Sequence, residues 1–441
     1  MAAAAPKLHL KQLDGLRGPL CVGVIAINMG LYNAGANIPV GVFLVLSGLT
    51  SFLAYSTKRW DDASCAQFFK RRLGRLLPML LIATTFQLCA SIPWLLRPGV
   101  VVPGASSGGI FAAMVTLLSL ILTLAGSGAI CRGTACGCCQ IDRWPRPPCA
   151  LLPVVLGTYL NGPGWYVGLL LFLNAYFIPK LLAKYGDAWR AAPPSWVALL
   201  GWALPEALQY GLPLLVYVAS GSADAWYYAT LYIYLGIPPL FRLVTLMFGL
   251  QLGRWTLFEA SKERGAESRV ISEAKTLLPM LASALIVTFL HGFLEPESEL
   301  HRPDTGATPL QWAVIHVIHP FNVLALVCGL VAAPQSLVAR FLASAPLAVA
   351  ADLSYAMYLL HYGIITIYVF VFDKTWEAEF ERLQASSDAT ALDARDYVCV
   401  VLLSIALAYP VTRWIEPLVA KWFEAHIEGP AQGTPKNSNL L

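Results

Sequence analysis

The sequence has few charged residues. Asp, Glu, Lys and Arg make up 13% of its 441 residues, about half of the roughly 25% found in soluble domains. The residues AVILMFWYC account for 57%, so a water-soluble globule of this composition could not cover its surface with polar groups. The balance of 30 basic and 26 acidic residues gives no reason to expect a nucleic-acid partner. These features exclude disordered, collagen-like and ordinary soluble chains, and they predict an integral membrane protein.

Two common targeting signals are also missing. No apolar signal-peptide region precedes Lys7 and Lys11, and no Asn-x-Ser/Thr acceptor for glycosylation occurs. We therefore expect no cleaved leader, and the sequence does not identify the membrane.

What the sequence does have is a series of apolar stretches of about 20 residues, the length needed to cross the ~30 Å bilayer core. They predict an all-α fold, a polytopic transmembrane helix bundle with about 10 to 12 spans. The expected spans lie near residues 16–34, 38–57, 75–97, 109–127, 164–183, 195–219, 226–252, 276–294, 310–333, 354–373 and 397–420, with a shorter apolar piece near 149–160.

The charged loops between these spans predict the orientation. Lys and Arg gather in residues 58–75, 180–190 and 254–275, whereas residues 295–304 and 373–396 are acidic. Short Lys/Arg-rich loops stay in the cytoplasm. The protein is thus expected to be multi-pass, with both termini in the cytoplasm.

The expected domain organisation is one transmembrane domain, residues 13–422, between a cytoplasmic N-terminus 1–12 and a cytoplasmic tail 423–441. Five cysteines cluster within an insert at residues 128–149. Their spacing is irregular for a zinc site, and disulfides would require the external side. We expect an insert without a bound metal.

The first span carries two polar residues on one face. Asn28 follows Arg17 by eleven positions, which is three helical turns plus about 20°. This arrangement puts a cation at the cytoplasmic end of the first span and an amide near the midplane of the bilayer. Each also has an ordinary explanation, a positive-inside anchor for Arg17 and a helix–helix hydrogen bond for Asn28.

Two arginines precede the third span. Arg72 and Arg75 are three positions apart, so they share a helical face. Two guanidinium groups placed in this way can bind phosphates. A positive-inside anchor is the structural alternative.

Other polar residues within spans are candidates because such groups are costly inside a membrane, and Trp165 is a candidate at the start of a span. Small-residue packing, an interfacial aromatic belt and histidines satisfied by neighbours are the structural alternatives. A His-x-x-His pair can ligate zinc, but no third ligand lies at metal spacing, so no metal is expected. The candidates are Ser47, Trp165, Arg242, His316, His319 and His361.

Seven short blocks, taken in order, resemble the acyltransferase 3 family of integral-membrane acyltransferases, over about residues 13 to 417. The blocks are Leu13-Asp14-Gly15-Leu16-Arg17-Gly18, Ser47-Gly48, Arg72-x-x-Arg75-x-x-Pro78, Gly164-Trp165-Tyr166, Arg242 with Phe248-Gly249, Ser354-Tyr355-x-x-Tyr358-Leu359-Leu360-His361, and Glu416-Pro417.

The resemblance implies transfer of an acyl group, often acetyl, from acyl-CoA to a hydroxyl of a carbohydrate or lipid acceptor. Acyl-CoA is then a co-substrate, no cofactor stays bound, and membrane lipids surround the protein. Arg72 and Arg75, with Arg17, would bind the donor. The family has a histidine as catalytic base eleven positions after the first-span arginine, where this sequence has Asn28. Asn28 is then a candidate for orienting the hydroxyl, and His361, His316 or His319 for the base.

Two alternatives remain open. The first is a family member without catalysis that binds or carries a lipid, sterol or acyl donor, which the change to Asn28 favours. The second is an unrelated transporter or channel. An arginine within a span, Arg242, and the prolines near it are features that such a protein would have.

Overall fold

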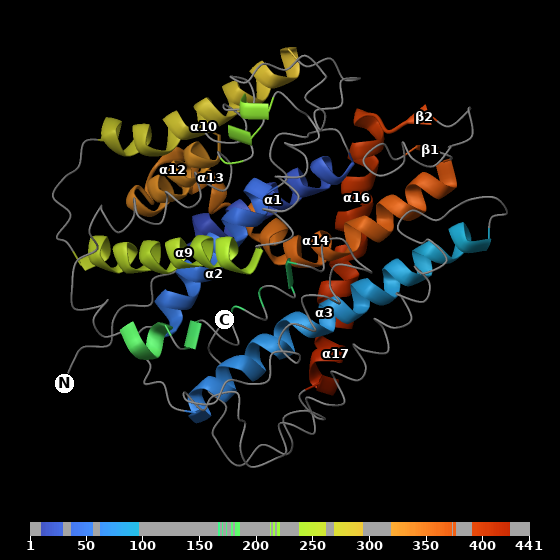
Figure 1. The fold of residues 1–441 in the computed structure, drawn as a ribbon, viewed down its shortest axis with the longest axis horizontal. Helices are drawn as coiled ribbons and strands as arrows, with labels where there is room; N and C mark the ends of the chain where they lie inside the picture. Colours follow the sequence, from blue (N-terminus) through green and yellow to red (C-terminus); the bar gives the residue numbers. More distant parts are fainter. Residues whose placement is uncertain are drawn as a thin grey trace. The chain divides into compact units, whose positions relative to one another are not determined.

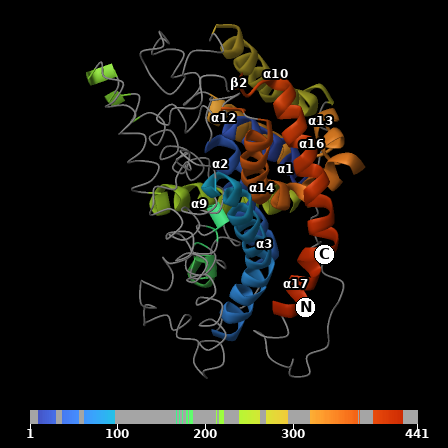
Figure 2. The ribbon, with the colours of Figure 1, turned by 90° about the vertical axis from the view of Figure 1, so that its right-hand side faces the viewer.

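The computed structural model describes residues 10–29, 37–55, 62–96, 238–261, 269–293, 319–372, 374–375 and 390–423, with scattered positions between 166 and 220. Almost all of these residues are helical (Figure 1, Figure 2). The exceptions include a parallel pair of two-residue strands, β1 (Lys374–Thr375) and β2 (Thr390–Ala391). The all-α prediction is therefore confirmed for the described part of the chain.

The main helices follow the apolar stretches of the sequence. They are α1 (Lys11–Asn28), α2 (Asn37–Tyr55), α3 (Asp62–Leu96), α9 (Pro238–Ser261), α10 (Arg269–Phe293), α12 (His319–Ala332), α13 (Leu337–Leu342), α14 (Ala345–Phe372), α16 (Ala394–Pro410), the π-helical turn η4 (Val411–Ile415) and α17 (Glu416–Phe423).

Two helices in the described residues are long and apolar enough to cross a membrane, Ala345–Phe372 and Ala394–Trp422. Ala394–Trp422 contains the predicted span 397–420, and Ala345–Phe372 covers the predicted span 354–373 except for its last residue. Pro39–Tyr55 and Asn322–Ala332 are apolar but shorter. The predicted spans near 109–127, 149–160 and 195–219, the insert 128–149 and most of the tail lie wholly or mostly outside the described residues.

The chain divides into two compact units. The first comprises Met1–Lys58, Leu181–Tyr358 and Asp373–Val401. The second comprises Arg59–Lys180, Leu359–Phe372 and Leu402–Leu441.

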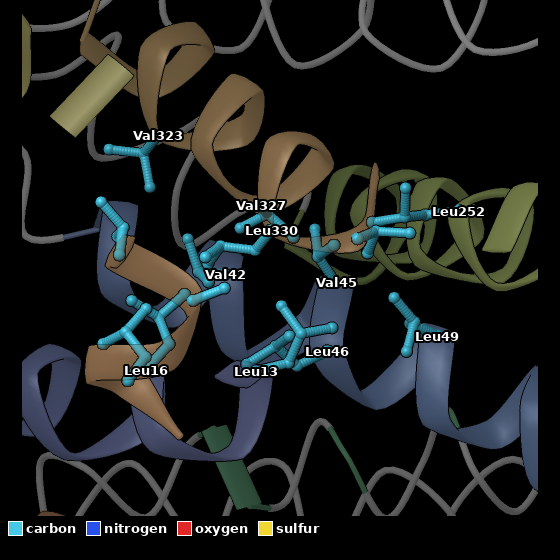
Figure 3. Close-up of a cluster of buried hydrophobic side chains, with 14 of the residues drawn as sticks. Leu13, Leu16, Val42, Val45, Leu46, Leu49, Leu252, Val323, Val327 and Leu330 are labelled. Atoms are coloured by element: carbon cyan, nitrogen blue, oxygen red, sulfur yellow. The ribbon is translucent and has the colours of Figure 1, made fainter. Parts of the chain in front are cut away.

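The core of the first unit is an aliphatic cluster from α1, α2, α9, α12 and α13 (Figure 3). Val45, Val327 and Leu330 are fully buried in it. Near the start of α1, Gln12 donates a hydrogen bond to the Leu330 carbonyl at 3.1 Å. Side chains from distant parts of the sequence thus fix α1 against α12 and α13.

Glycines allow α2 and α9 to cross closely (Figure 1). A Cβ added at Gly48 would lie 2.2 Å from the carbonyl oxygen of Leu246, and one at Gly249 would lie 2.1 Å from that of Val45. Only glycine leaves room for these approaches. The packing explanation of the Ser47-Gly48 block therefore accounts for Gly48, and Gly249 is its counterpart on the facing helix.

Helices α10 and α12 pair around a proline. Pro279 lies inside α10 and has no N–H to donate to the carbonyl of Lys275 four residues earlier. Gly329 of α12 approaches that carbonyl so closely that a Cβ would lie 2.1 Å from its oxygen. The Asn322 amide donates to the Pro279 carbonyl at 2.6 Å and to the Ser283 hydroxyl at 2.7 Å. Such neighbouring groups are what make proline tolerable in a membrane helix.

In the second unit, α3 packs against the last part of α14 and against α17 (Figure 1). Gln87 donates to the hydroxyl of Thr366 at 3.3 Å. Gly363 leaves space for the ring of Phe86, 2.7 Å from where its Cβ would be. Helix α3 begins at Asp62, well before the span expected from residue 75, because Gln, Lys, Arg and Leu favour helix.

Large apolar side chains remain exposed on α10 and α16. Leu278 and Leu285 of α10 are 64% and 69% exposed, and Leu402 of α16 is 59% exposed. Extended exposed apolar surface is unusual on soluble proteins and ordinary on helices that face lipid. Together with the two long apolar helices, it indicates a membrane protein.

Candidate functional site

Helix α1 presents the first set of candidate residues. Arg17 and Asn28 are both partly exposed. Cys21 lies between them on the same face, is fully buried, and donates to the carbonyl of Ser354 on α14 at 3.3 Å. The part of this face at Cys21 therefore lies against α14 in the interior of the first unit.

The tyrosine hydroxyl of Tyr397 on α16 reaches the same part of α1. It donates to the carbonyl of Val22 at 3.1 Å. Helices α14 and α16 thus contribute polar groups beside the middle of α1.

The glycines of the first motif block serve packing. A Cβ at Gly15 would collide with the carbonyl oxygen of Leu342, and one at Gly18 would lie 2.7 Å from the Ala350 side chain. These contacts bring the helix that carries Arg17 against α13 and the start of α14. The block therefore combines one candidate cation with the small residues that position its helix.

Arg72 lies over an aromatic ring on α3. Its guanidinium carbon is 5.5 Å from the centroid of the Phe68 ring, one turn earlier. Phe68 is only 2% exposed, so the ring is fixed by its packing. A cation over a ring face is attracted by the ring quadrupole. This attraction restricts the Arg72 side chain to part of its conformational range.

Arg75 is exposed on α3 and has an acidic neighbour. Glu416, the first residue of α17, is partly buried and interacts electrostatically with Arg75. Helix α17, which begins at Glu416, packs against α3.

His361 lies in α14 and is fully buried. Its ring meets the Tyr362 ring edge-on, with centroids 6.4 Å apart. Histidine is the side chain whose ordinary pKa suits proton transfer near neutrality. A buried imidazole in a helix of this kind is therefore a reasonable candidate base.

The remaining candidates are only partly described. Ser47 is partly buried on α2, beside Gly48 in the α2–α9 crossing. Arg242 begins the second turn of α9 and His319 begins α12, but only their backbone is described. Trp165 and His316 lie outside the described residues.

The candidates divide between the two units. Arg17, Asn28 and Ser47 belong to the first unit, and Arg72, Arg75 and His361 to the second. Within the described ranges, no group of three or more His, Cys, Asp or Glu side chains is placed to hold a metal ion.

Sequence reasoning missed Phe68 beneath Arg72, Tyr397 beside the middle of α1, and the association of Glu416 with Arg75. Phe68 was detectable, since it precedes Arg72 by four positions on the same helix face. Tyr397 and the Glu416–Arg75 association had no local signal, because each depends on helices that are hundreds of residues apart in the sequence.

Comparison with known proteins gives one match. A family model described as an acyltransferase domain, acyltransferase 3, matches residues 10–413. No curated protein and no solved structure matches the chain.

Proposed function

Because the chain belongs to the acyltransferase 3 family, we propose that it is an integral-membrane acyltransferase that uses acyl-CoA, with acetyl-CoA the first donor to test. The acceptor is a hydroxyl of a carbohydrate or lipid. The observation that carries this proposal is the family match, which covers nearly the whole chain. The paired arginines of α3 support it, since guanidinium groups bind phosphates.

The proposed reaction is a direct acyl transfer. The acceptor oxygen attacks the thioester carbonyl, a new C–O ester bond forms, and the C–S bond breaks. The hydroxyl proton leaves as the oxygen attacks, and the departing sulfur of coenzyme A takes up a proton. A general base contributes about 10²- to 10⁴-fold to such a step.

In this proposal Arg72 and Arg75, with Arg17, bind the phosphates of the donor at the cytoplasmic mouth. Asn28 cannot accept a proton at neutral pH, but its amide can orient the acceptor or donate to the developing oxyanion. His361 is the first candidate for the base. Ser47, Arg242 and the other histidines rank below it.

The proposed topology is multi-pass with both termini in the cytoplasm. It follows from the Lys/Arg-rich loops. Under this topology the starts of α1 and α3 face the cytoplasm, the side on which acyl-CoA is made.

A second candidate function is favoured by one residue. Asn28 occupies the position at which the first-span motif of the family has a histidine. A member of the family that had lost catalysis would retain donor binding and carry or sense an acyl donor or lipid.

The experiment is release of coenzyme A from acetyl-CoA by the purified protein in liposomes, with sugar and lipid acceptors. We compare the wild type with an Arg72→Ala, Arg75→Ala double variant and with Lys58→Ala as a basic control. Release that is lost in the double variant and kept in the control supports the acyltransferase. Binding of acetyl-CoA without release supports the second candidate, and equal behaviour of both variants refutes the arginine assignment.

A further inference from the structure

The helix formed by α16, η4 and α17 is longer than a membrane span needs to be. It runs from Ala394 to Trp422 and has 29 residues, which is about 44 Å at 1.5 Å per residue. The hydrocarbon core of a bilayer is only ~30 Å thick. To stay within the core, the helix would need a tilt of about 45°, beyond the 0–40° range of membrane helices. About a third of its length therefore lies outside the core.

Charged residues show which third this is. The helix begins after Asp393, whose carboxylate accepts hydrogen bonds from the amides of Arg395 and Asp396 at 2.7 and 2.9 Å. Arg395 is exposed, and the next exposed charge along the helix is Arg413, 18 positions later, or about 27 Å along the axis. The exposed residues between the two arginines, all within the described part of the chain, are uncharged. Because charges avoid the hydrocarbon core, the core lies between these arginines and α17 lies beyond it.

Beyond Arg413, large apolar side chains are exposed along one side of the helix. Trp414, Leu418 and Trp422 are spaced four residues apart and are 61%, 65% and 54% exposed. Residues four positions apart share a helix face. The ring of Trp414 also meets that of Tyr409 edge-on, with centroids 6.3 Å apart. We call the exposed surface of these three residues, Trp414, Leu418 and Trp422, the Trp–Leu–Trp stripe.

Two cations flank this stripe. Arg413 and Lys421 are exposed, and each immediately precedes a tryptophan of the stripe, so they lie about 100° around the helix from it. The side of α17 away from both is closed, because α17 packs against α3 (Figure 1) and Val419 and Ala420 are partly buried. Cations beside exposed Trp and Leu are typical of helices that lie at a membrane surface.

A π-helical turn separates this segment from the span. The turn η4 occupies Val411–Ile415, and thus lies where the exposed charge of Arg413 marks the edge of the core. Sharp bends in helices occur at π turns. The turn therefore gives α17 a direction of its own, independent of the direction in which α16 crosses the membrane.

We propose that α17 lies in the headgroup region of the bilayer and binds anionic phospholipids. The Trp–Leu–Trp stripe lies between the upper parts of the acyl chains, where tryptophan keeps its ring in apolar and its N–H in polar surroundings. Arg413 and Lys421 bind the lipid phosphates. Under the proposed topology this is the cytoplasmic leaflet, which carries the anionic lipids. The inference does not depend on acyl transfer.

The test uses the full-length protein in nanodiscs that contain photoactivatable phospholipids. A shallow probe has a diazirine near the ester of its acyl chain, and a deep probe has it at the chain end. Each probe is made with a phosphatidylglycerol and with a phosphatidylcholine headgroup, and mass spectrometry identifies the labelled residues. We compare the wild type with an Arg413→Gln, Lys421→Gln double variant. The matched control is Lys275→Gln, Arg340→Gln, which removes two exposed cations from the first unit.

We expect the shallow probe to label residues 414–422 and the deep probe to label the exposed face of α16 around Leu402. The shallow phosphatidylglycerol probe should label residues 414–422 about threefold to tenfold more than the phosphatidylcholine probe, since each basic residue near the surface favours anionic lipid about fivefold. The preference should disappear in the double variant and in 1 M salt, where the Debye length is only about 3 Å. The matched control should keep it.

Four results would overturn the inference. Labelling of residues 414–422 by the deep probe in place of the shallow one would mean that the helix continues straight through the core. Absence of labelling by both probes would mean that another protein surface, such as a second copy of the chain, covers the stripe. Equal labelling by the two headgroups, or a preference that the double variant retains, would mean that the cations do not bind lipid phosphate. If the double variant fails to fold, the salt dependence of wild-type labelling decides the question.

Discussion

Replacing Gly48 by alanine should separate α2 from α9. The new Cβ would lie 2.2 Å from the Leu246 carbonyl oxygen, about 1.2 Å closer than an ordinary contact, which begins near 3.4 Å. The atom in the way is backbone, so a whole helix must shift. Overpacking of this kind costs about 1–3 kcal/mol, and replacing a mid-helix glycine by alanine recovers about 0.5–1 kcal/mol. We expect a net loss of up to about 2.5 kcal/mol of unfolding free energy.

The assay is reversible unfolding of the purified protein in mixed micelles with increasing denaturing detergent. Gly41→Ala is the control, since nothing lies within 4 Å of its added Cβ on the same helix. That variant should be stabilised by about 0.5–1 kcal/mol.

The partner variant sharpens the test. Gly249→Ala should cost a similar amount, because its Cβ would lie 2.1 Å from the Val45 carbonyl oxygen. One separation of the helices accommodates both methyl groups, so the double variant should lose less than the two single losses combined. Strict additivity, or a Gly48→Ala protein as stable as Gly41→Ala, would refute the close crossing.

Three further outcomes are expected. Asn322→Ala removes the hydrogen bond to the Pro279 carbonyl and should cost about 1 kcal/mol in the same unfolding assay, the scale of polar contacts between membrane helices; an unchanged stability would contradict the contact. Phe68→Leu keeps an apolar side chain but removes the ring beneath Arg72, and should raise the KM for acetyl-CoA about twofold to fivefold with kcat unchanged, from a cation–π loss of about 0.5–1 kcal/mol. Asn28→His should raise kcat by at least about tenfold at neutral pH if the lack of a general base limits the rate. An unchanged kcat would mean that another residue serves as the base.

The positions of several helices could be predicted because apolar length determines what can cross a bilayer. The expected span 397–420 falls inside one of the two long apolar helices, and the other covers the expected span 354–373 except for its last residue. Helix α3 begins at Asp62, before the span expected from residue 75. Its first turns are polar, and a search for apolar stretches passes over polar helix even where the residues favour it.

The candidate site was predictable in its residue types and not in its contacts. The three-residue spacing of Arg72 and Arg75 puts them on one face of any helix, and the structure has that helix. Local spacing is all that a single sequence displays. Which distant helix faces Arg75 depends on how α17 packs, and that packing is determined by many side chains acting together.

The contacts of the glycines also could not be predicted from local sequence. The Ser47-Gly48 block suggested close approach of a backbone, either beside a cavity or in helix packing. Only the facing carbonyl of Leu246 distinguishes the two, and it comes from a segment almost 200 positions away.

The pairing of α10 with α12 has a consequence for how the chain is assembled in the cell. Pro279 removes one internal hydrogen bond from α10, and the residues that pack against this part of α10, Asn322 and Gly329, belong to a helix synthesised later. Asn322 follows Pro279 by 43 positions. While those positions are being synthesised, the backbone of α10 around Pro279 has no partner from α12. The contacts between the two helices therefore form only after α12 has been synthesised.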